Sequence, residues 1–280
     1  MAHGSLGCQS KPWTSTWDLR NTVRIWSGKV RFKIISVGWQ CSDWVQQTLN
    51  SVQLQTRTDW DLMVVYDKSA DDGGNKIRNW CNRADLHGKA SYVLNDEQHY
   101  ACRNQYVGLK LLAPEDNDII IFLDLDGDQL AHSRVLQSVA DAYEDDTLVT
   151  YGSYKPVPDE GTSSPAIPFP RDVVVANSYR NFINQPLTPT SFNHLRTMKG
   201  RVFNSIPEDQ FKRENGEWYT IGTDYVFMIP ALERAGGKYK CLTETLLLYN
   251  HDNPYADFRV NPGHDGVVDV LKRTPLDPLP

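Results

Sequence analysis

An uninterrupted apolar run, Ile119-Ile120-Ile121-Phe122-Leu123, is the feature that most constrains how this chain can fold. A strand with water on one face alternates apolar and polar side chains, whereas a strand covered on both faces is apolar throughout. Strands of the second kind belong to sheets that are packed against helices on both sides. The run therefore predicts an α/β protein with a buried, mostly parallel sheet.

Further apolar, β-branched runs alternate with segments of helical periodicity. Strands are predicted at residues 30–37, 61–66, 90–94, 118–123 and 147–151. Helices are predicted at 76–83, 97–113 and 133–143, with another starting at Asp43 as its N-cap and a last one at 224–235, interrupted by Pro230. This alternation is typical of βαβ units, in which ligands bind beyond the carboxyl ends of the strands.

The composition is that of a protein with a hydrophobic core. With 280 residues, 40% hydrophobic and 23% charged, the chain suits one large domain or one domain with a modest extension. A net charge of −6 argues against a broad face for nucleic acid. No stretch approaches the roughly 18 apolar residues of a membrane span, and residues 1–11 lack the apolar core of a signal peptide. Five cysteines without a C-x-x-C pair suit a reducing compartment, so we expect a cytoplasmic protein with no integral membrane segment.

The buried strand runs into an acidic segment, Asp124-Leu125-Asp126-Gly127-Asp128. Alternate side chains at a strand end lie on the same side, so the carboxylates of Asp124 and Asp126 can converge. Carboxylate oxygens suit Mg²⁺ or Mn²⁺ held together with substrate phosphates. An acidic surface turn explains an isolated triplet equally well. The apolar strand directly before it favours the metal site, with Asp128 as a bystander or supporting residue.

Two further aspartates follow predicted structural boundaries. Asp67 comes directly after the strand 61–66, where a carboxylate can hydrogen-bond a base or a ribose, or can simply lie in a solvated turn. Asp224 follows a glycine at a predicted helix start, where an N-cap is the commonplace role and a general base the alternative. His251 and His264 are interpreted as structural, with completion of a metal site as the alternative.

A basic block lies in this otherwise acidic chain at His194, Arg196 and Lys199. Arginine and lysine bind phosphate oxygens, and arginine does so through a bidentate fork. A surface cluster paired with nearby acids is the alternative, and charge alone favours it.

Three segments, at residues 35–37, 48–55 and 64–71, resemble the opening of the family 2 glycosyltransferases with a GT-A fold. Arg103-Asn104 stands where that family often has an Arg-Asn pair, and residues 121–126 resemble its D-x-D strand. The motifs are spread in order over roughly residues 30–250, so they are more specific than D-x-D alone. The resemblance implies a Rossmann-like, mostly parallel sheet flanked by helices, with a smaller acceptor-side subregion.

The resemblance also implies a division of the chain. We expect an N-terminal extension at residues 1–28, a nucleotide-sugar-binding half at 29–155, an acceptor-side half of the same domain at 156–250 and a C-terminal tail at 251–280. The first five residues of the extension read as a cloning remnant. A proline-rich stretch near 155–170 is predicted to be a long loop that closes over the donor.

Site roles are implied residue by residue. The implied donor-binding residues are Val37, Asp67, Arg103, Asn104, Asp124 and Leu125. Asp124 and Asp126 would hold Mn²⁺ or Mg²⁺ against the donor diphosphate. His194, Arg196 and Lys199 would contact the acceptor or the diphosphate, and Asp224 would be the general base. In the family's usual acidic pairs, Tyr66 replaces the first acid before Asp67, and Thr223 replaces the acid before Asp224.

The expected function is metal-dependent transfer of a sugar, with inversion, from a nucleotide-diphosphate donor to an acceptor hydroxyl. A UDP-sugar is the first candidate donor and a glycan the first candidate acceptor, with protein as another. A hydroxymethylated DNA base is an alternative acceptor, if a basic patch forms from Arg196, Lys199, Arg201, Lys212 and Arg213. Two rival functions are those of a nucleotidyltransferase-like enzyme and of a non-catalytic nucleotide-sugar-binding module. The sequence does not indicate an oligomeric state.

Overall fold

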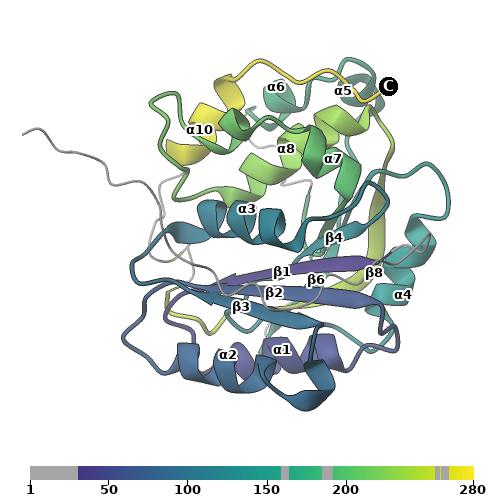
Figure 1. Ribbon diagram of the computed structural model, residues 1–280. Helices are drawn as coiled ribbons and strands as arrows, with labels where there is room; N and C mark the ends of the chain where they lie inside the picture. The colour runs from purple at the N-terminus through teal and green to yellow at the C-terminus, as the bar shows by residue number, and fades with distance from the viewer. Residues whose placement is uncertain (1–30, 159–163, 185–191, 256–258, 260–264) are drawn as a thin grey trace, which may run out of the picture.

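The computed structural model describes residues 31–158, 164–184, 192–255, 259 and 265–280, and it shows a sheet between two layers of helices (Figure 1). The strands are β1 Phe32–Gly38, β2 Trp60–Tyr66, β3 Ala90–Leu94, β4 Ile119–Phe122, β5 Gln129–Leu130, β6 Val149–Val157, β7 Arg196–Lys199 and β8 Tyr239–Asn250. The helices are α1 Val45–Gln53, α2 Gly73–Cys81, α3 Tyr100–Leu112, α4 Val135–Ala142, α5 Arg171–Val175, α6 Tyr179–Ile183, α7 Gly200–Ser205, α8 Thr223–Ala235 and α10 Asp265–Lys272. Two 3-10 turns are η1 Ala84–Leu86 and η2 Glu208–Phe211. The predicted α/β class is confirmed.

The sheet has the strand order β3-β2-β1-β4-β7-β6-β8-β5. Its first four strands are parallel, as predicted. β7 runs antiparallel to both β4 and β6, and β5 runs antiparallel to β8, so this half of the sheet is mixed. In register, Gly38 lies opposite Tyr66, and Ile35 lies opposite Phe122. The carboxyl ends of β1, β2 and β4 therefore meet at one edge of the sheet.

The apolar run of β4 contributes to both faces of the sheet, as its composition predicts. Ile119 and Ile121 belong to the core beneath α1, α2 and α4. Ile120 and Phe122 belong to the core beneath α3, α7 and α8 (Figure 1). All four side chains are buried. The strand that leads into the acidic segment is thus fixed by packing on both sides, which gives the site a rigid support.

Two local predictions about helices are wrong. Asp43 does not cap α1, because the helix begins at Val45 with Trp44 as its N-cap and no side-chain cap bond. Pro230 does not interrupt α8, which is continuous over its whole length. The proline ring costs the helix one N–H donor, but the surrounding residues of α8 are buried in the core, and this packing holds the helix together.

The C-terminal part of the chain is integrated into the fold. α10 packs against α6 and α8, and the buried Arg180 side chain joins Glu233 of α8 to the carbonyl of Val270. The amide of Leu276 also donates to Glu233. The weakly patterned tail therefore covers the helix layer that carries Asp224. In the described part of the chain, no helix is long and apolar enough to cross a membrane.

Candidate active site

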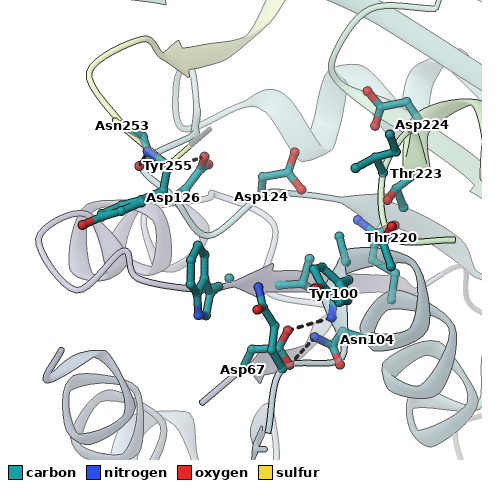
Figure 2. Close-up of a pocket in the computed structure, with 18 of the residues that line it drawn as sticks. Asp67, Tyr100, Asn104, Asp124, Asp126, Thr220, Thr223, Asp224, Asn253 and Tyr255 are labelled. Carbon is teal, nitrogen blue, oxygen red and sulfur yellow. Dashed lines mark hydrogen bonds between the residues drawn. The ribbon is translucent and has the colours of Figure 1, made fainter. Parts of the chain in front are cut away.

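Residues from several elements surround a cavity of about 300 Å³ at the carboxyl edge of the sheet. Seven predicted site residues line it: Val37, Asp67, Asn104, Asp124, Asp126, His194 and Asp224. Figure 2 shows Asp67 with Tyr100 and Asn104 at one end, Asp124 in the middle, and Asp224 and Asp126 on opposite sides of Asp124. Chain segments far apart in sequence thus converge on a single site, as expected for the ends of parallel strands.

Asp67 is held by four hydrogen bonds from neutral N–H groups. The side-chain amides of Asn95 and Asn104 donate to Oδ1 at 2.9 and 2.8 Å. The backbone amides of His99 and Tyr100 donate to Oδ2 at 3.0 and 2.8 Å. Figure 2 shows the bonds from Tyr100 and Asn104. Two carboxylate oxygens offer about four acceptor positions, so Asp67 is saturated by the protein. A base or ribose contact would require one of these bonds to be exchanged.

Tyr66, which stands where the family usually has an acid, points away from the cavity. Its hydroxyl donates to the carboxylate of Asp71 and accepts a hydrogen bond from the amide of Cys41. Asp71 also accepts from the amides of Ser42 and Gly73. Tyr66 therefore ties the loop after β1 to the loop after β2. The tyrosine that stands here in place of the family's acid therefore adds no group to the cavity.

The acidic segment after β4 has three differently placed carboxylates. Asp124 lines the cavity with a side chain 34% exposed. Asp126 accepts a hydrogen bond from Asn253 at 2.9 Å. Asp128 is fully buried and accepts from the amide of Asn250 at 2.9 Å, while its other oxygen has no hydrogen-bond partner in the described residues. Asp128 therefore lies in the buried interior, close to Asp124 and His194.

Burial determines the charge states around this segment. It raises the pKa of Asp128 well above its usual range, and the nearby carboxylates of Asp126 and Asp124 raise that pKa further. Burial also raises the pKa of Asp124, but Arg196 opposes this shift. For His194, burial and then Arg196 lower the pKa well below its usual value, so the ring is neutral. A neutral imidazole and an orphaned carboxyl oxygen are both able to accept a cation.

A group of three residues offers ligand atoms for a metal ion. Asp124, Asp128 and His194 each present one such atom within 4.8 Å of the others. Oxygen and imidazole nitrogen donors fit a divalent cation such as Mn²⁺. Asp126, predicted as the partner of Asp124, lines the same cavity but falls outside this group of three. The donor set supports a divalent-cation site here, and its assignment to Asp124 and Asp126 stays a prediction.

Arg196 and Asp224 form an ion pair at the floor of the site. The Arg196 guanidinium also lies 3.8 Å from Asp124, and one of its nitrogens lies 2.7 and 2.9 Å from the two ring nitrogens of His194. Asp224 is the second residue of α8, whose N-cap is Gly222, so the commonplace N-cap role does not apply to it. Its side chain is 48% exposed and faces the cavity, which suits a group that exchanges a proton with a ligand.

Four predicted contacts are not in the cavity wall of the described structure: Arg103, Leu125, Arg196 and Lys199. Leu125 packs in the core with no exposed surface. Arg103 lies on α3, whose cavity-lining residues are Tyr100, Ala101, Asn104 and Gln105. Lys199 sits opposite Ile119 at the far end of β4, and its ammonium group donates to the carbonyl of Asn117. The prediction that Lys199 contacts a ligand here is wrong, because β7 runs away from the site.

The other predicted features have different outcomes. His251 is not among the cavity-lining residues that the structure describes, and His264 lies outside the described residues. Of the basic residues considered for DNA, Arg196 and Lys199 are buried, Lys212 pairs with Glu208, Arg213 pairs with Asp269, and Arg201 is exposed. Residues 159–163 of the predicted lid lie outside the described structure, while Ala166 and Phe169 are buried in the core.

Several cavity residues were missed by the sequence interpretation. Trp39 and Tyr255 meet edge to face at a centroid distance of 5.7 Å, and both line the cavity. Tyr100 has a φ of 62°, a left-handed conformation. The hydrogen bond from its backbone amide to Asp67 helps to hold this conformation. Trp39 follows β1 directly, so its position at a strand end could have revealed it. Asn253 and Tyr255 carry no comparable signal.

The arrangement defines an α/β protein with a carboxylate-rich ligand site at the ends of parallel strands, the class that includes the GT-A transferases. The family model described as Glycosyl transferase family 2 matches residues 34–206, more than half of the chain. The chain belongs to this family.

Solved structures with the same fold extend the comparison. S. aureus TarS 1–349 is 15% identical with a TM-score of 0.57, over 79% of this chain and 60% of that one. The mannosyltransferase PcManGT from Pyrobaculum calidifontis, in complex with GDP-Man and Mn²⁺, is 15% identical with a TM-score of 0.52, over 82% and 59%. GalNAc-T7 with UDP, GalNAc and Mn²⁺ is 13% identical with a TM-score of 0.54, over 80% and 44%. No curated protein sequence matches the chain. The chain thus spans about 60% of the length of TarS 1–349.

Proposed function

We propose that this chain transfers a sugar from a nucleotide-diphosphate donor to an acceptor hydroxyl. The observation that supports this most strongly is the convergence of Asp67, Asp124, Asp126 and Asp224 on one cavity at the carboxyl edge of the sheet. Membership of the family and the fold shared with structures that hold UDP-GlcNAc or GDP-Man support the same class of donor.

The donor lies with its nucleotide toward Asp67 and its diphosphate toward Asp124 and Asp126. The Asp67 hydrogen bonds fix the backbone at His99 and Tyr100, which forms the wall on the nucleotide side. Asp124 and Asp126 would hold a divalent cation, and His194 and Asp128 offer further ligand atoms close to Asp124. When bound, the cation neutralises the negative charge that develops on the leaving diphosphate.

Asp224 acts as the general base. It accepts the proton of the acceptor hydroxyl, whose oxygen forms a bond to the anomeric carbon. The bond between that carbon and the diphosphate oxygen breaks at the same time, and its electron pair leaves with the nucleoside diphosphate. Attack from the face opposite the leaving group inverts the anomeric configuration. A base at a separate side of the cavity from Asp126 suits this geometry (Figure 2).

A donor screen tests the proposal. We expect one nucleotide sugar among UDP- and GDP-linked sugars to raise the melting temperature in the presence of Mn²⁺, and that donor to label a glycan acceptor. Release of pyrophosphate in place of sugar transfer would identify a nucleotidyltransferase instead. Stabilisation without transfer or donor hydrolysis would identify a binding module. If no nucleotide sugar stabilises the protein, the proposal is wrong.

The acceptor is proposed to be a glycan. Burial of Arg196 and Lys199, and the pairing of Lys212 and Arg213 with acidic side chains, favour a glycan over DNA. A parallel assay with hydroxymethylated DNA provides the check, since labelling of the DNA and not of glycans would reverse this choice.

A further inference from the structure

Arg196 is a buried cation where the proposed donor and acceptor sites meet. It is the first residue of β7 and stands opposite Phe122, at the end of β4 that leads into Asp124. Its guanidinium pairs with Asp224 and lies 3.8 Å from Asp124. One rigid, planar group therefore contacts both the carboxylate proposed for the donor and the carboxylate proposed for the acceptor.

The guanidinium lies behind these carboxylates and not in the main cavity. The Arg196 side chain is 4% exposed, compared with 34% for Asp124 and 48% for Asp224. Both aspartates line the 300 Å³ cavity and Arg196 does not. Arg196 borders a small adjoining cavity that shares Asp224 and Gln105 with the main one. A phosphate in the main cavity would meet the carboxylates first. This placement argues against Arg196 as a direct substrate contact.

The ion pair determines how Asp224 is presented. α8 starts after Gly222, which has a φ of 69°, and the start of the helix has no side-chain cap bond. The guanidinium engages Oδ1 of Asp224. Oδ2 lies outside this ion pair and is the oxygen left to accept a proton. Many catalytic bases are held in this way: a neighbouring side chain binds one oxygen of the carboxylate, and the other oxygen receives the proton.

The same guanidinium opposes any second cation near Asp124. Two positive charges a few ångströms apart in a partly buried site repel each other strongly. A divalent cation alone therefore binds against the charge of Arg196. A cation that arrives with a diphosphate brings its own negative charge and is opposed much less.

We infer that Arg196 is a positioning residue that orients Asp224 as the base and weakens metal binding at Asp124 until a diphosphate accompanies the metal. The inference rests on the proposed function and replaces the predicted substrate contact of Arg196.

Three variants test it. Arg196→Gln removes the charge, Arg196→Lys keeps the charge but loses the planar fork, and Arg201→Gln is the matched control. Arg201 is an exposed arginine on α7, beyond the end of β7 that lies away from the site. Binding of Mn²⁺ without nucleotide is measured by electron paramagnetic resonance, and nucleotide binding by calorimetry with UDP and GDP. Steady-state kinetics give kcat and donor KM, and circular dichroism verifies folding.

We expect Arg196→Gln to bind Mn²⁺ about tenfold more tightly than Arg201→Gln does. Its kcat should fall about 100-fold with an unchanged donor KM, because the base is misplaced while the donor site is intact. Arg196→Lys should bind Mn²⁺ as the wild type does but show a reduced kcat. If Arg196 had only a structural role, its loss would loosen the protein and weaken Mn²⁺ binding. The direction of the change in Mn²⁺ affinity therefore distinguishes a positioning role from a structural one.

Other outcomes overturn the inference. Weaker nucleotide binding by Arg196→Gln would show that Arg196 contacts the substrate. An Mn²⁺ affinity equal to that of Arg201→Gln would show that Arg196 does not affect metal binding. If Arg196→Gln does not fold, Arg196→Lys decides, and a wild-type kcat in that variant rejects the positioning role. Absence of sugar transfer by the wild type would instead defeat the proposed function, whereas the Mn²⁺ titration would still report on Arg196.

Discussion

The carboxylates at the two ends of the cavity are compensated in opposite ways. At the end proposed for the nucleotide, Asp67 alone accepts four hydrogen bonds from neutral donors and is 2% exposed. At the other end, the guanidinium of Arg196 interacts with the carboxylates of Asp224, Asp124 and Asp128. The carboxylate of Asp126 is near Asp128 and raises its pKa. The same site thus contains one aspartate that is satisfied by four hydrogen-bond donors, and several aspartates that share one described cation, Arg196.

The difference indicates which end supports the fold and which end carries the chemistry. A saturated carboxylate stabilises the loops that it joins and has little left to offer a ligand. A cluster of carboxylates with too little positive charge is unfavourable in the folded protein unless a cation binds there. Such clusters of perturbed groups are common at functional sites. Substitutions at each end of the cavity therefore test this contrast.

Asp126→Ala should reduce sugar transfer about a thousandfold or more, because the loss of the cation removes several kcal/mol of transition-state stabilisation. Turnover is measured with and without added Mn²⁺. Asp116→Ala, an exposed aspartate away from the cavity, is the control and should behave as the wild type. Metal-dependent transfer at the wild-type rate by Asp126→Ala would remove Asp126 from the metal site.

Asp224→Asn should slow transfer by roughly 10²–10⁴-fold, the usual contribution of a general base. Donor binding should be retained, because the proposed mechanism assigns Asp224 to the acceptor. Single-turnover rates and calorimetry with the nucleoside diphosphate separate the two effects. A variant that still transfers sugar at the wild-type rate would place the base elsewhere, and one that loses donor binding as well would make Asp224 part of the donor site.

The parts of the site that could be predicted from sequence are those fixed by strand ends. Asp67 and Asp124 follow apolar strands, and parallel register alone brings them to one edge. The pairing of Arg196 with Asp224 could not be predicted in this way, because it depends on β7 entering the sheet antiparallel beside β4. The same geometry explains the error at Lys199, which is close to Arg196 in sequence but is carried to the opposite end of the strand.

The saturation of Asp67 was also hidden in the sequence. Its four donors come from residues 95, 99, 100 and 104, and they converge only because of the turn that precedes α3. A motif shows that an aspartate follows a strand, but the hydrogen-bond partners of that aspartate depend on tertiary structure. The sequence therefore predicted that these residues meet at one edge of the sheet, but it did not predict how the protein compensates the charge of each carboxylate.

Asp67→Ala should lower the free energy of unfolding by roughly 2 to 4 kcal/mol, because it strands several donors that are buried or partly buried. Asp126→Ala should change it by less than about 1 kcal/mol, because this change relieves repulsion among carboxylates while losing one bond from Asn253. Urea denaturation of both variants measures the contrast. Equal destabilisation by the two changes would mean that the two ends of the cavity contribute to the fold in the same way.

Tyr66→Phe should have the smallest effect, about 1 kcal/mol of stability and no loss of transfer. The hydroxyl joins Asp71 to the amide of Cys41 on the side of β2 that faces away from the cavity, and Asp71 keeps its bonds from Ser42 and Gly73. Denaturation and donor KM give the two measurements. A several-fold rise in donor KM would show that the loop after β1, and with it Trp39, depends on Tyr66 for its position. The functional end of the cavity would then extend to the far side of β2.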